Sequence, residues 1–242
     1  MKTSFIYGVH PIDEALKQQS VLELFINKQA DQKNIISVVQ SATKQKIPTQ
    51  IVSAKELDHM VGKVSHQGIV AKIKDPKIQQ FSEWIKNTEL SEKTLVVLLD
   101  ELTDPQNVGA IIRTAFGMGA TAILMPKHNQ ASLGSFVWKA SAGMVAKACL
   151  VEVNNVNQSI RTLKEKGFWI YGLSEKGTID IDTAQFDTKT CVIVGNEGYG
   201  IRSKTTELCD VLLKIPIHKE LDSYNASVSA GILMYEWNRQ NK

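Results

Sequence analysis

An apolar run, LVVLL at residues 95–99 within the segment TLVVLLDEL, constrains the fold more than any other feature of the sequence. Strands that face water on one side alternate apolar and polar side chains, whereas this run is apolar at consecutive positions. The pattern predicts a strand buried on both faces, and such strands belong to parallel sheets covered by helices. We therefore expect an α/β unit that starts near residue 93.

Five further apolar segments repeat this pattern, with helical segments between them. The expected strands are TAILMP, CLVEV, FWIYGLS, TCVIVGN and VLLKIPI. The expected helices are VGAIIRTAFGMG, GSFVWKASAGMVAK, VNQSIRTLKEKG and RSKTTELC. Ligands of such sheets bind at the carboxyl ends of the strands, so polar residues that directly follow a strand are candidate site residues.

The chain is expected to divide into three parts. Short apolar runs alternate with helical segments up to about residue 74, which predicts a small α/β domain over residues 1–75. Residues 76–92 are polar and irregular and are predicted to be a linker, with a connecting helix inside a single domain as the alternative. Residues 93–242 form the second domain.

Composition limits the function classes without choosing one. No apolar run approaches the roughly 18 residues of a membrane helix, and the start MKTSFIYG lacks the apolar core of a secretory signal, so we expect a cytoplasmic protein. The formal charge of +3 permits a nucleic-acid partner without requiring one. Three cysteines and five histidines lack ligand spacing, so no metal is expected, and His66 is kept as a candidate RNA contact.

The first polar cluster is DPQNVGAIIRTA, directly after the strand at residues 94–102. Asp104 and Pro105 end that strand, Asn107 lies where a helix begins, and Arg113 projects from the helix. Arg113 is one of only four arginines among 28 basic residues, which singles it out for a specific role. Alternatively, Asn107 is only a helix cap and Arg113 is only a solvated helix residue.

The second cluster is VGNEGYGI, after the strand TCVIVGN. Gly195, Gly198 and Gly200 permit close backbone approach to a ligand, and Glu197 is the carboxylate among them. The order of the glycines differs from the dinucleotide fingerprint, and a plain tight loop remains the alternative. Arg202, just beyond, is either a phosphate contact at a helix start or a solvated residue.

The third cluster, KIPIHKELDSYNASVSAG, runs from the last strand into the last helix. Four polar residues gather at that helix start, more than capping requires: Ser223, Asn225, Ser227 and Ser229. The helix that follows has two apolar stripes, one with Ala230 and Trp237 and one with Val228 and Tyr235. Such a helix is expected to be buried in its domain or against a partner subunit.

In this order, the three clusters resemble the three motifs of the SpoU (TrmH) family of RNA ribose 2′-O-methyltransferases. YGVHPIDEAL near the start and HQGIVA at residues 66–71 resemble the substrate-binding domain of bacterial members that methylate a guanosine in 23S ribosomal RNA. WKASAGMVAK is similar too, so the resemblance covers essentially the whole chain.

The resemblance implies an α/β-knot catalytic domain, in which the C-terminal segment is threaded into a trefoil knot, plus a small ribosomal-protein-like α/β domain. It implies S-adenosylmethionine as cofactor, and a homodimer whose active site takes residues from both subunits. Carried over by position, the cofactor-binding residues are Gly195, Ile215 and Tyr224. The implied catalytic group is Asn107, Arg113, Glu197, Ser223 and Asn225.

The sequence departs from the family pattern at three positions. Lys219 stands where the family usually has glycine, Tyr224 where it has leucine, and Ala226 where it has valine. These changes lie around the expected cofactor loop, so they bear on cofactor affinity. All five polar catalytic positions match.

The implied chemistry requires one proton to leave the ribose 2′-hydroxyl. A guanidinium keeps its own proton at neutral pH, so we expect Arg113 to stay charged and to stabilise the developing alkoxide through a bidentate contact. Two alternatives remain: a methyltransferase for transfer RNA or another ribosomal RNA site, and a non-catalytic RNA-binding ribosome-assembly factor of the same fold.

Overall fold

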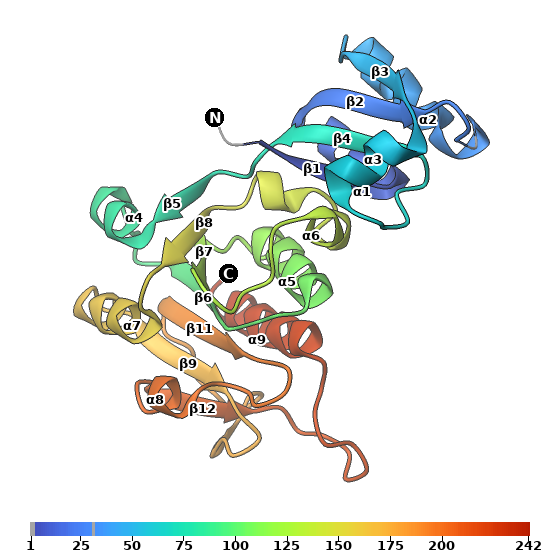
Figure 1. The fold of residues 1–242 in the computed structure, drawn as a ribbon. Helices are drawn as coiled ribbons and strands as arrows, with labels where there is room; N and C mark the ends of the chain where they lie inside the picture. The colour runs from blue at the N-terminus through green and yellow to red at the C-terminus, as the bar shows by residue number, and fades with distance from the viewer. Residues whose placement is uncertain (1–2, 31) are drawn as a thin grey trace. The chain divides into compact units, whose positions relative to one another are not determined.

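The structure is a computed structural model that describes residues 3–30 and 32–242, and the chain falls into two compact units (Figure 1). Unit 1 comprises Met1–Lys77 and Ser132–Lys147, and unit 2 comprises Ile78–Ala131 and Ala148–Lys242. The segment at residues 132–147 therefore folds with unit 1, although the sequence places it within residues 93–242.

Unit 1 is built on a four-stranded sheet of order β1-β4-β2-β3. β4 is antiparallel to β1 and β2, while β2 and β3 are parallel. The strands are β1 (Thr3–Tyr7), β2 (Val21–Asn27), β3 (Thr49–Val52) and β4 (Ile69–Lys74), and the helices are α1 (Val9–Lys17), α2 (Gln32–Lys44) and α3 (Ala54–Val61). The sequence predicted each of these strands and helices.

The segment that joins unit 1 from later in the chain holds α6 (Ser135–Ala140) and the short 3-10 helix η1 (Met144–Ala146). Ser135 Oγ accepts a hydrogen bond of 3.0 Å from the backbone N–H of Tyr7 in β1. Gly143 separates the two helical pieces with φ +76°, and a Cβ there would lie 3.2 Å from the carbonyl oxygen of Glu14. The single helix predicted over residues 134–147 is thus broken by a left-handed turn that lets the chain approach α1.

Unit 2 contains an eight-stranded sheet of order β10-β12-β9-β11-β6-β7-β8-β5. Every neighbouring pair is parallel, which confirms the predicted parallel α/β sheet. The strands are β5 (Ile78–Gln80), β6 (Thr94–Asp100), β7 (Ala122–Pro126), β8 (Leu150–Val153), β9 (Trp169–Leu173), β10 (Ile179–Asp180), β11 (Lys189–Gly195) and β12 (Val211–Lys214). All seven residues of β6 are buried, as its unbroken apolar pattern predicted.

Helices pack on this sheet around a core that includes Trp84. They are α4 (Phe81–Asn87), α5 (Pro105–Gly117), α7 (Val156–Glu165), α8 (Ser203–Thr206) and α9 (Ala226–Gln240). β5 and α4 come from the region expected to be a linker. β5 pairs with β8, and Trp84 is 1% exposed, so most of residues 78–92 is an ordered part of unit 2.

Helices α5 and α9 lie side by side and run in the same direction. Asn225 contacts Asn107 at one end, and Asn238 Nδ2 donates a 3.1 Å hydrogen bond to the Met118 carbonyl oxygen at the other. Because the helices are parallel, their amino-terminal ends meet at the same place, close to the carboxyl ends of the strands.

Candidate active site

The site begins where β6 and β11 end. The two strands are neighbours in the sheet, and Gly195 at the end of β11 is in register with Asp100 at the end of β6. The loops that follow, β6–α5 and β11–α8, therefore leave the sheet at the same edge and side by side. These loops carry the first and second polar clusters.

Asn107 lies in the first turn of α5 but is not its cap. Asp104 is the cap residue, and its side chain accepts a 2.9 Å hydrogen bond from the backbone N–H of Gln106. The 5%-exposed Asn107 side chain is thereby free for another contact, and its Nδ2 donates to Glu197 Oε1 at 3.1 Å. The capping alternative for Asn107 is wrong, because an aspartate three residues earlier already fills that position.

Asn225 extends this contact to the third cluster. Its Nδ2 donates to Asn107 Oδ1 at 2.9 Å, while its Oδ1 accepts from the backbone N–H groups of Ser227 and Val228 and so caps α9. Glu197, Asn107 and Asn225 form a hydrogen-bonded chain across three loops, which we call the amide relay. The relay thus joins Asn107 to Asn225, which lie 118 positions apart in the sequence.

The side chains of Arg113 and Ser223 are exposed and make no hydrogen bond or ion pair within the part of the chain that the structure describes. Arg113 lies six residues after Asn107 on α5, which corresponds to about 9 Å along the axis and about 120° around it. A single subunit therefore joins three of the five expected catalytic residues. Arg113 faces a different direction from the amide relay.

The expected cofactor residues lie at the same edge of the sheet. Ile215 directly follows β12, and the Tyr224 hydroxyl donates to the carbonyl oxygen of the adjacent Pro216 at 3.2 Å. Gly195 ends β11, and a Cβ there would lie 2.3 Å from the backbone of Gly200. Only glycine permits this close return of the loop.

The segment after β12 offers hydrogen-bond donors to a ligand. Among the described residues, no chain atom accepts a hydrogen bond from the backbone N–H of Ile215 or Ile217. Both residues are partly buried. Unpaired backbone donors beside apolar side chains suit a purine ring with its nitrogen acceptors.

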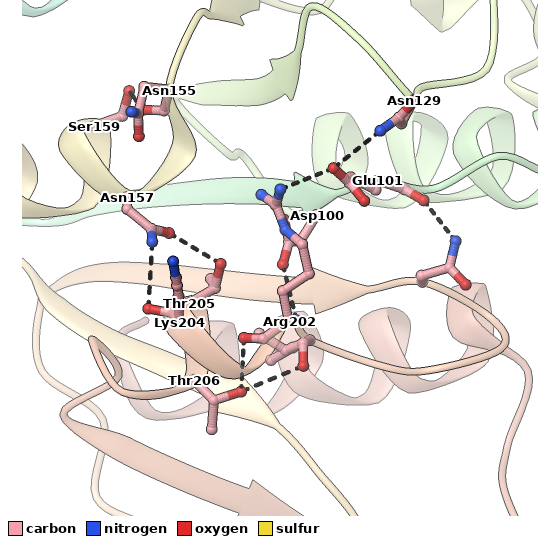
Figure 2. Close-up of polar contacts among 12 residues, drawn as sticks. Asp100, Glu101, Asn129, Asn155, Asn157, Ser159, Arg202, Lys204, Thr205 and Thr206 are labelled. Carbon is pink, nitrogen blue, oxygen red and sulfur yellow. Dashed lines mark hydrogen bonds and ion pairs between the residues drawn. The ribbon is translucent and has the colours of Figure 1, made fainter.

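A further group of polar side chains, separate from the three clusters of the sequence, holds the glycine-rich loop in place through ion pairs (Figure 2). The Asp100 carboxylate has no exposed surface, and it pairs with the Arg202 guanidinium at 2.6 Å. It also accepts a 3.2 Å hydrogen bond from the Arg202 backbone N–H. Arg202 thus spans the gap between the end of β6 and the start of α8, and it is held by ion pairs rather than being a purely solvated residue.

Glu101 is the second carboxylate of this cluster. It accepts from Arg202 Nη1 at 2.8 Å and from the Tyr199 hydroxyl at 2.7 Å. Its backbone is in the left-handed region with φ +62°, a conformation that costs a non-glycine residue about 1 kcal/mol. We call Asp100, Glu101, Tyr199 and Arg202 the ionic clamp.

The pKa values within the clamp follow from its contacts. The hydrogen bond from Tyr199 is the main factor that lowers the pKa of Glu101, helped by Asn129 and the charge of Arg202 against the opposing effect of burial. The same bond to Glu101 raises the pKa of Tyr199 to about 12. Burial lowers the pKa of Arg202, but its bond to Asp100 and the charges around it raise the pKa above its ordinary value. Glu101, Tyr199 and Arg202 therefore keep their charge state near neutral pH.

The loop between β11 and α8 is a closed turn. Backbone hydrogen bonds of 3.0 and 2.9 Å join Asn196 to Gly200 in both directions. The Asn196 side chain donates to the Glu101 carbonyl oxygen at 2.7 Å and accepts from the Gly198 N–H at 2.8 Å. Glu197 and Tyr199 thus project from one rigid five-residue turn.

The sequence did not reveal the ionic clamp. Asp100 and Glu101 looked like the end of an apolar strand, and Tyr199 looked like a spacer between glycines. One signal in the sequence was the scarcity of arginine. Arg202 is one of only four arginines and follows a glycine-rich loop, while Asp100 and Glu101 end an earlier strand.

The described residues contain neither a metal-binding group of side chains nor a membrane-spanning helix. No group of three or more His, Cys, Asp or Glu side chains within residues 3–30 and 32–242 is arranged to hold a metal ion. Over the same residues, no helix has the length and apolar character needed to cross a membrane.

Two family models match the chain. The SpoU rRNA Methylase family model matches residues 94–235, and the model for RNA 2′-O ribose methyltransferase substrate binding matches residues 5–79. The two matches do not overlap.

Curated relatives match over the full length. A 23S rRNA (guanosine-2′-O-)-methyltransferase RlmB of Photobacterium profundum is 34% identical, with all of both chains covered. The RlmB of Neisseria meningitidis is 35% identical over 97% of this chain and 94% of its own. A putative TrmH family tRNA/rRNA methyltransferase of Staphylococcus aureus is 32% identical over 98% of this chain and 96% of its own.

Solved structures share the fold. The SpoU methyltransferase AviRb from Streptomyces viridochromogenes, in complex with AdoMet, has a TM-score of 0.76 at 24% identity and covers 98% of this chain and 89% of its own. An RNA 2′-O ribose methyltransferase has a TM-score of 0.75 at 23% identity, with 98% and 88% covered.

Proposed function

The chain belongs to the SpoU rRNA Methylase family, and from that premise we propose that it methylates the ribose 2′-hydroxyl of a guanosine in 23S ribosomal RNA. The methyl group comes from S-adenosylmethionine, in the cytoplasm. The observation that carries the proposal is the amide relay, which brings polar residues of all three family motifs together at the carboxyl edge of the sheet. The relatives named for this reaction match over the whole chain, which favours the same substrate.

We assign cofactor binding to Gly195, Ile215 and Tyr224. When bound, S-adenosylmethionine supplies an electrophilic methyl group on a sulfonium. The free N–H groups of Ile215 and Ile217 would bind its purine ring, and the Tyr224 ring would pack beside it in place of the family's leucine. The close return of the chain at Gly195 would shape the floor of this pocket.

We assign catalysis to Asn107, Arg113, Glu197, Ser223 and Asn225. In the transfer, the ribose oxygen forms a bond to the methyl carbon as the bond from sulfur breaks, the sulfur keeps the electron pair as a neutral thioether, and the hydroxyl proton passes to water. Asn107 orients Glu197, whose exposed carboxylate would lie near the sulfonium charge. Arg113 would hold the developing alkoxide and a neighbouring phosphate, a task that suits its planar pair of donors. Ser223 and Asn225 would brace the cofactor segment.

We further propose a homodimer in which Arg113 acts in a site completed by the partner subunit. α9 buries Leu233 and Trp237 but leaves Val228 49% and Tyr235 55% exposed, so one of its two apolar stripes has no cover in a single chain. The exposed Phe116 on α5 extends this surface. A dimer formed here would cover these side chains, and it would bring a second copy of Arg113 near the first subunit's helices.

The trefoil knot and the domain roles are part of the same proposal. The chain has to return from β12 at one side of the sheet to lay α9 against α5, a connection that threading through an earlier loop would provide. Residues 1–75 would bind the RNA substrate, residues 76–92 would connect the two domains, and residues 93–242 would carry the reaction. The match of the substrate-binding model to residues 5–79 favours this division.

A second candidate is methylation of a transfer RNA or of another ribosomal RNA site, since a relative of equal similarity is named for both RNA classes. A non-catalytic assembly factor is disfavoured by the complete amide relay. Incubation with tritiated cofactor and either unmodified 23S ribosomal RNA or bulk transfer RNA separates the candidates. We expect label in the 23S RNA alone, at guanosine.

The same assay tests Arg113. Arg113→Lys keeps the charge but loses the planar pair of donors, so we expect turnover to fall about 100-fold or more while cofactor affinity stays unchanged. Near-normal turnover of this variant across pH would refute the bidentate role.

A further inference from the structure

Tyr199 is an exposed aromatic ring that the structure holds in one orientation. The residue is 58% exposed, yet its hydroxyl is fixed to Glu101 Oε2 at 2.7 Å. Glu101 is itself held by Arg202, and Arg202 by the fully buried Asp100. An exposed side chain normally samples several rotamers, so the clamp fixes a ring that faces solvent.

The ring lies close to the amide relay. Tyr199 and Glu197 are two residues apart on the closed turn of residues 196–200, so their Cα atoms lie within about 7 Å of each other. The Glu197 carboxylate bonds Asn107 and the Tyr199 hydroxyl bonds Glu101, and both of these partners lie in the segment that follows β6. The ring is thus presented beside the carboxylate where a ribose is expected to bind.

We propose that Tyr199 is a stacking platform for a nucleobase of the RNA strand, at or next to the methylated nucleotide. This proposal deepens the proposed function and rests on it. A ribose 2′-hydroxyl in a folded RNA reaches an enclosed site only when its nucleotide is splayed out of the helix, and splayed bases are commonly stacked on aromatic side chains. A flat ring fixed before binding loses little rotational freedom when a base stacks on it.

Within the ionic clamp, the hydroxyl group and the ring of Tyr199 have separate roles. The hydroxyl orients the ring through Glu101, and its raised pKa keeps it protonated as a donor. The ring faces solvent and would supply the contact area for a base. A residue that served only as a latch for the loop would need its hydroxyl alone.

Three variants of the full-length protein separate these roles. Tyr199→Leu removes the ring, Tyr199→Phe keeps the ring without the hydroxyl, and Tyr199→Trp enlarges the ring. For each, KM and kcat for methylation of unmodified 23S ribosomal RNA are measured, together with RNA affinity in the presence of S-adenosylhomocysteine and the affinity for that cofactor product alone. Thermal unfolding reports whether each variant is folded.

We expect Tyr199→Leu to weaken RNA binding and raise KM by about 5- to 100-fold, the range found when a stacking aromatic is removed. Affinity for the cofactor product should be unchanged, and kcat should fall less than KM rises. Tyr199→Phe and Tyr199→Trp should bind RNA within about 3-fold of the wild type.

Two results would overturn the stacking role. One is equal loss in Tyr199→Phe and Tyr199→Leu, which assigns the residue to the loop latch. The other is RNA affinity in Tyr199→Leu that matches the wild type. Absence of methylation by the wild-type protein would instead count against the proposed function, while the affinity measurements would still decide the role of the ring.

Discussion

The amide relay and the ionic clamp share the loops after β6 and β11, to which the relay adds Asn225 at the start of α9, but they differ in how completely their polar groups are satisfied. In the clamp, a buried carboxylate, a second carboxylate, a guanidinium and a phenol satisfy one another within one chain. In the relay, three side chains share two hydrogen bonds, and the carboxylate of Glu197 stays exposed. The contrast indicates that the clamp stabilises the loops while the relay is arranged for a ligand.

This comparison predicts that changes in the clamp act mainly on stability and changes in the relay mainly on activity. The largest effect is expected for Arg202→Met, which leaves the Asp100 carboxylate buried without its counter-charge. We expect the free energy of unfolding to fall by about 3 kcal/mol, the low end of the range for such losses, because the Arg202 side chain is 38% exposed. Urea unfolding measures it.

Arg239→Met is the matched control for that variant. Arg239 pairs with Glu236 within α9, but its side chain is 53% exposed, and exposed pairs contribute little to stability. If the two variants lost equal free energy of unfolding, the buried clamp would be no more stabilising than an ordinary surface ion pair.

Glu197→Gln tests the relay. The amide keeps the shape and can still accept from Asn107, but it removes the negative charge near the expected sulfonium. We expect kcat to fall about 100-fold, while the free energy of unfolding stays within about 0.5 kcal/mol of the wild type. The same change at Glu207, the residue directly after α8, should leave kcat unchanged. A loss of stability in Glu197→Gln would show that the relay is structural.

Asn225 contributes to both stability and activity, because its side-chain oxygen caps α9 while its side-chain nitrogen donates to Asn107. Asn225→Asp keeps an oxygen that caps α9 but removes the donor to Asn107, so we expect near-normal stability and roughly 10-fold lower turnover. Asn225→Ala should lose the cap as well, which costs about 1 kcal/mol. If both variants lost stability equally, capping would not be separable from the relay.

The smallest effect is expected for Glu101→Gln, measured as the free energy of unfolding at different pH values. The pKa of Glu101 in the folded protein lies below its ordinary value of 4.5, mainly because Tyr199 donates to it. The stabilisation is therefore complete above pH 4.5 and is lost as the pH falls through the lower, folded value. The stability gap between wild type and Glu101→Gln, about 1 kcal/mol near pH 7, should shrink in acid, and a constant gap would contradict the ionised contact.

The two clusters also mark what sequence reasoning can reach. The parallel sheet followed from unbroken apolar runs such as that of β6, because burial on both faces leaves a direct mark on composition. The polar segments that follow the strands singled out Asn107, Glu197 and Asn225 as candidates, and the resemblance to the SpoU family implied their catalytic role. The break in the helix at Gly143 was missed, because it depends on α1, far away in the sequence.

The ionic clamp was missed for a related reason. Its members are common residue types whose pairing depends on the register of β6 and β11, which only the folded sheet fixes. Residues 78–85 lie in the segment that was expected to be a linker, since nothing local indicated that Trp84 would be buried.

The central claim is that the amide relay belongs to an enzyme acting on 23S ribosomal RNA. The most direct test maps 2′-O-methyl groups in 23S RNA from cells lacking this protein, complemented with the wild type or with Glu197→Gln. The account predicts one guanosine that is methylated with the wild type and unmethylated in the other two strains. Full methylation of every 23S guanosine site in the deletion strain, or restoration by Glu197→Gln to the wild-type level, would contradict it.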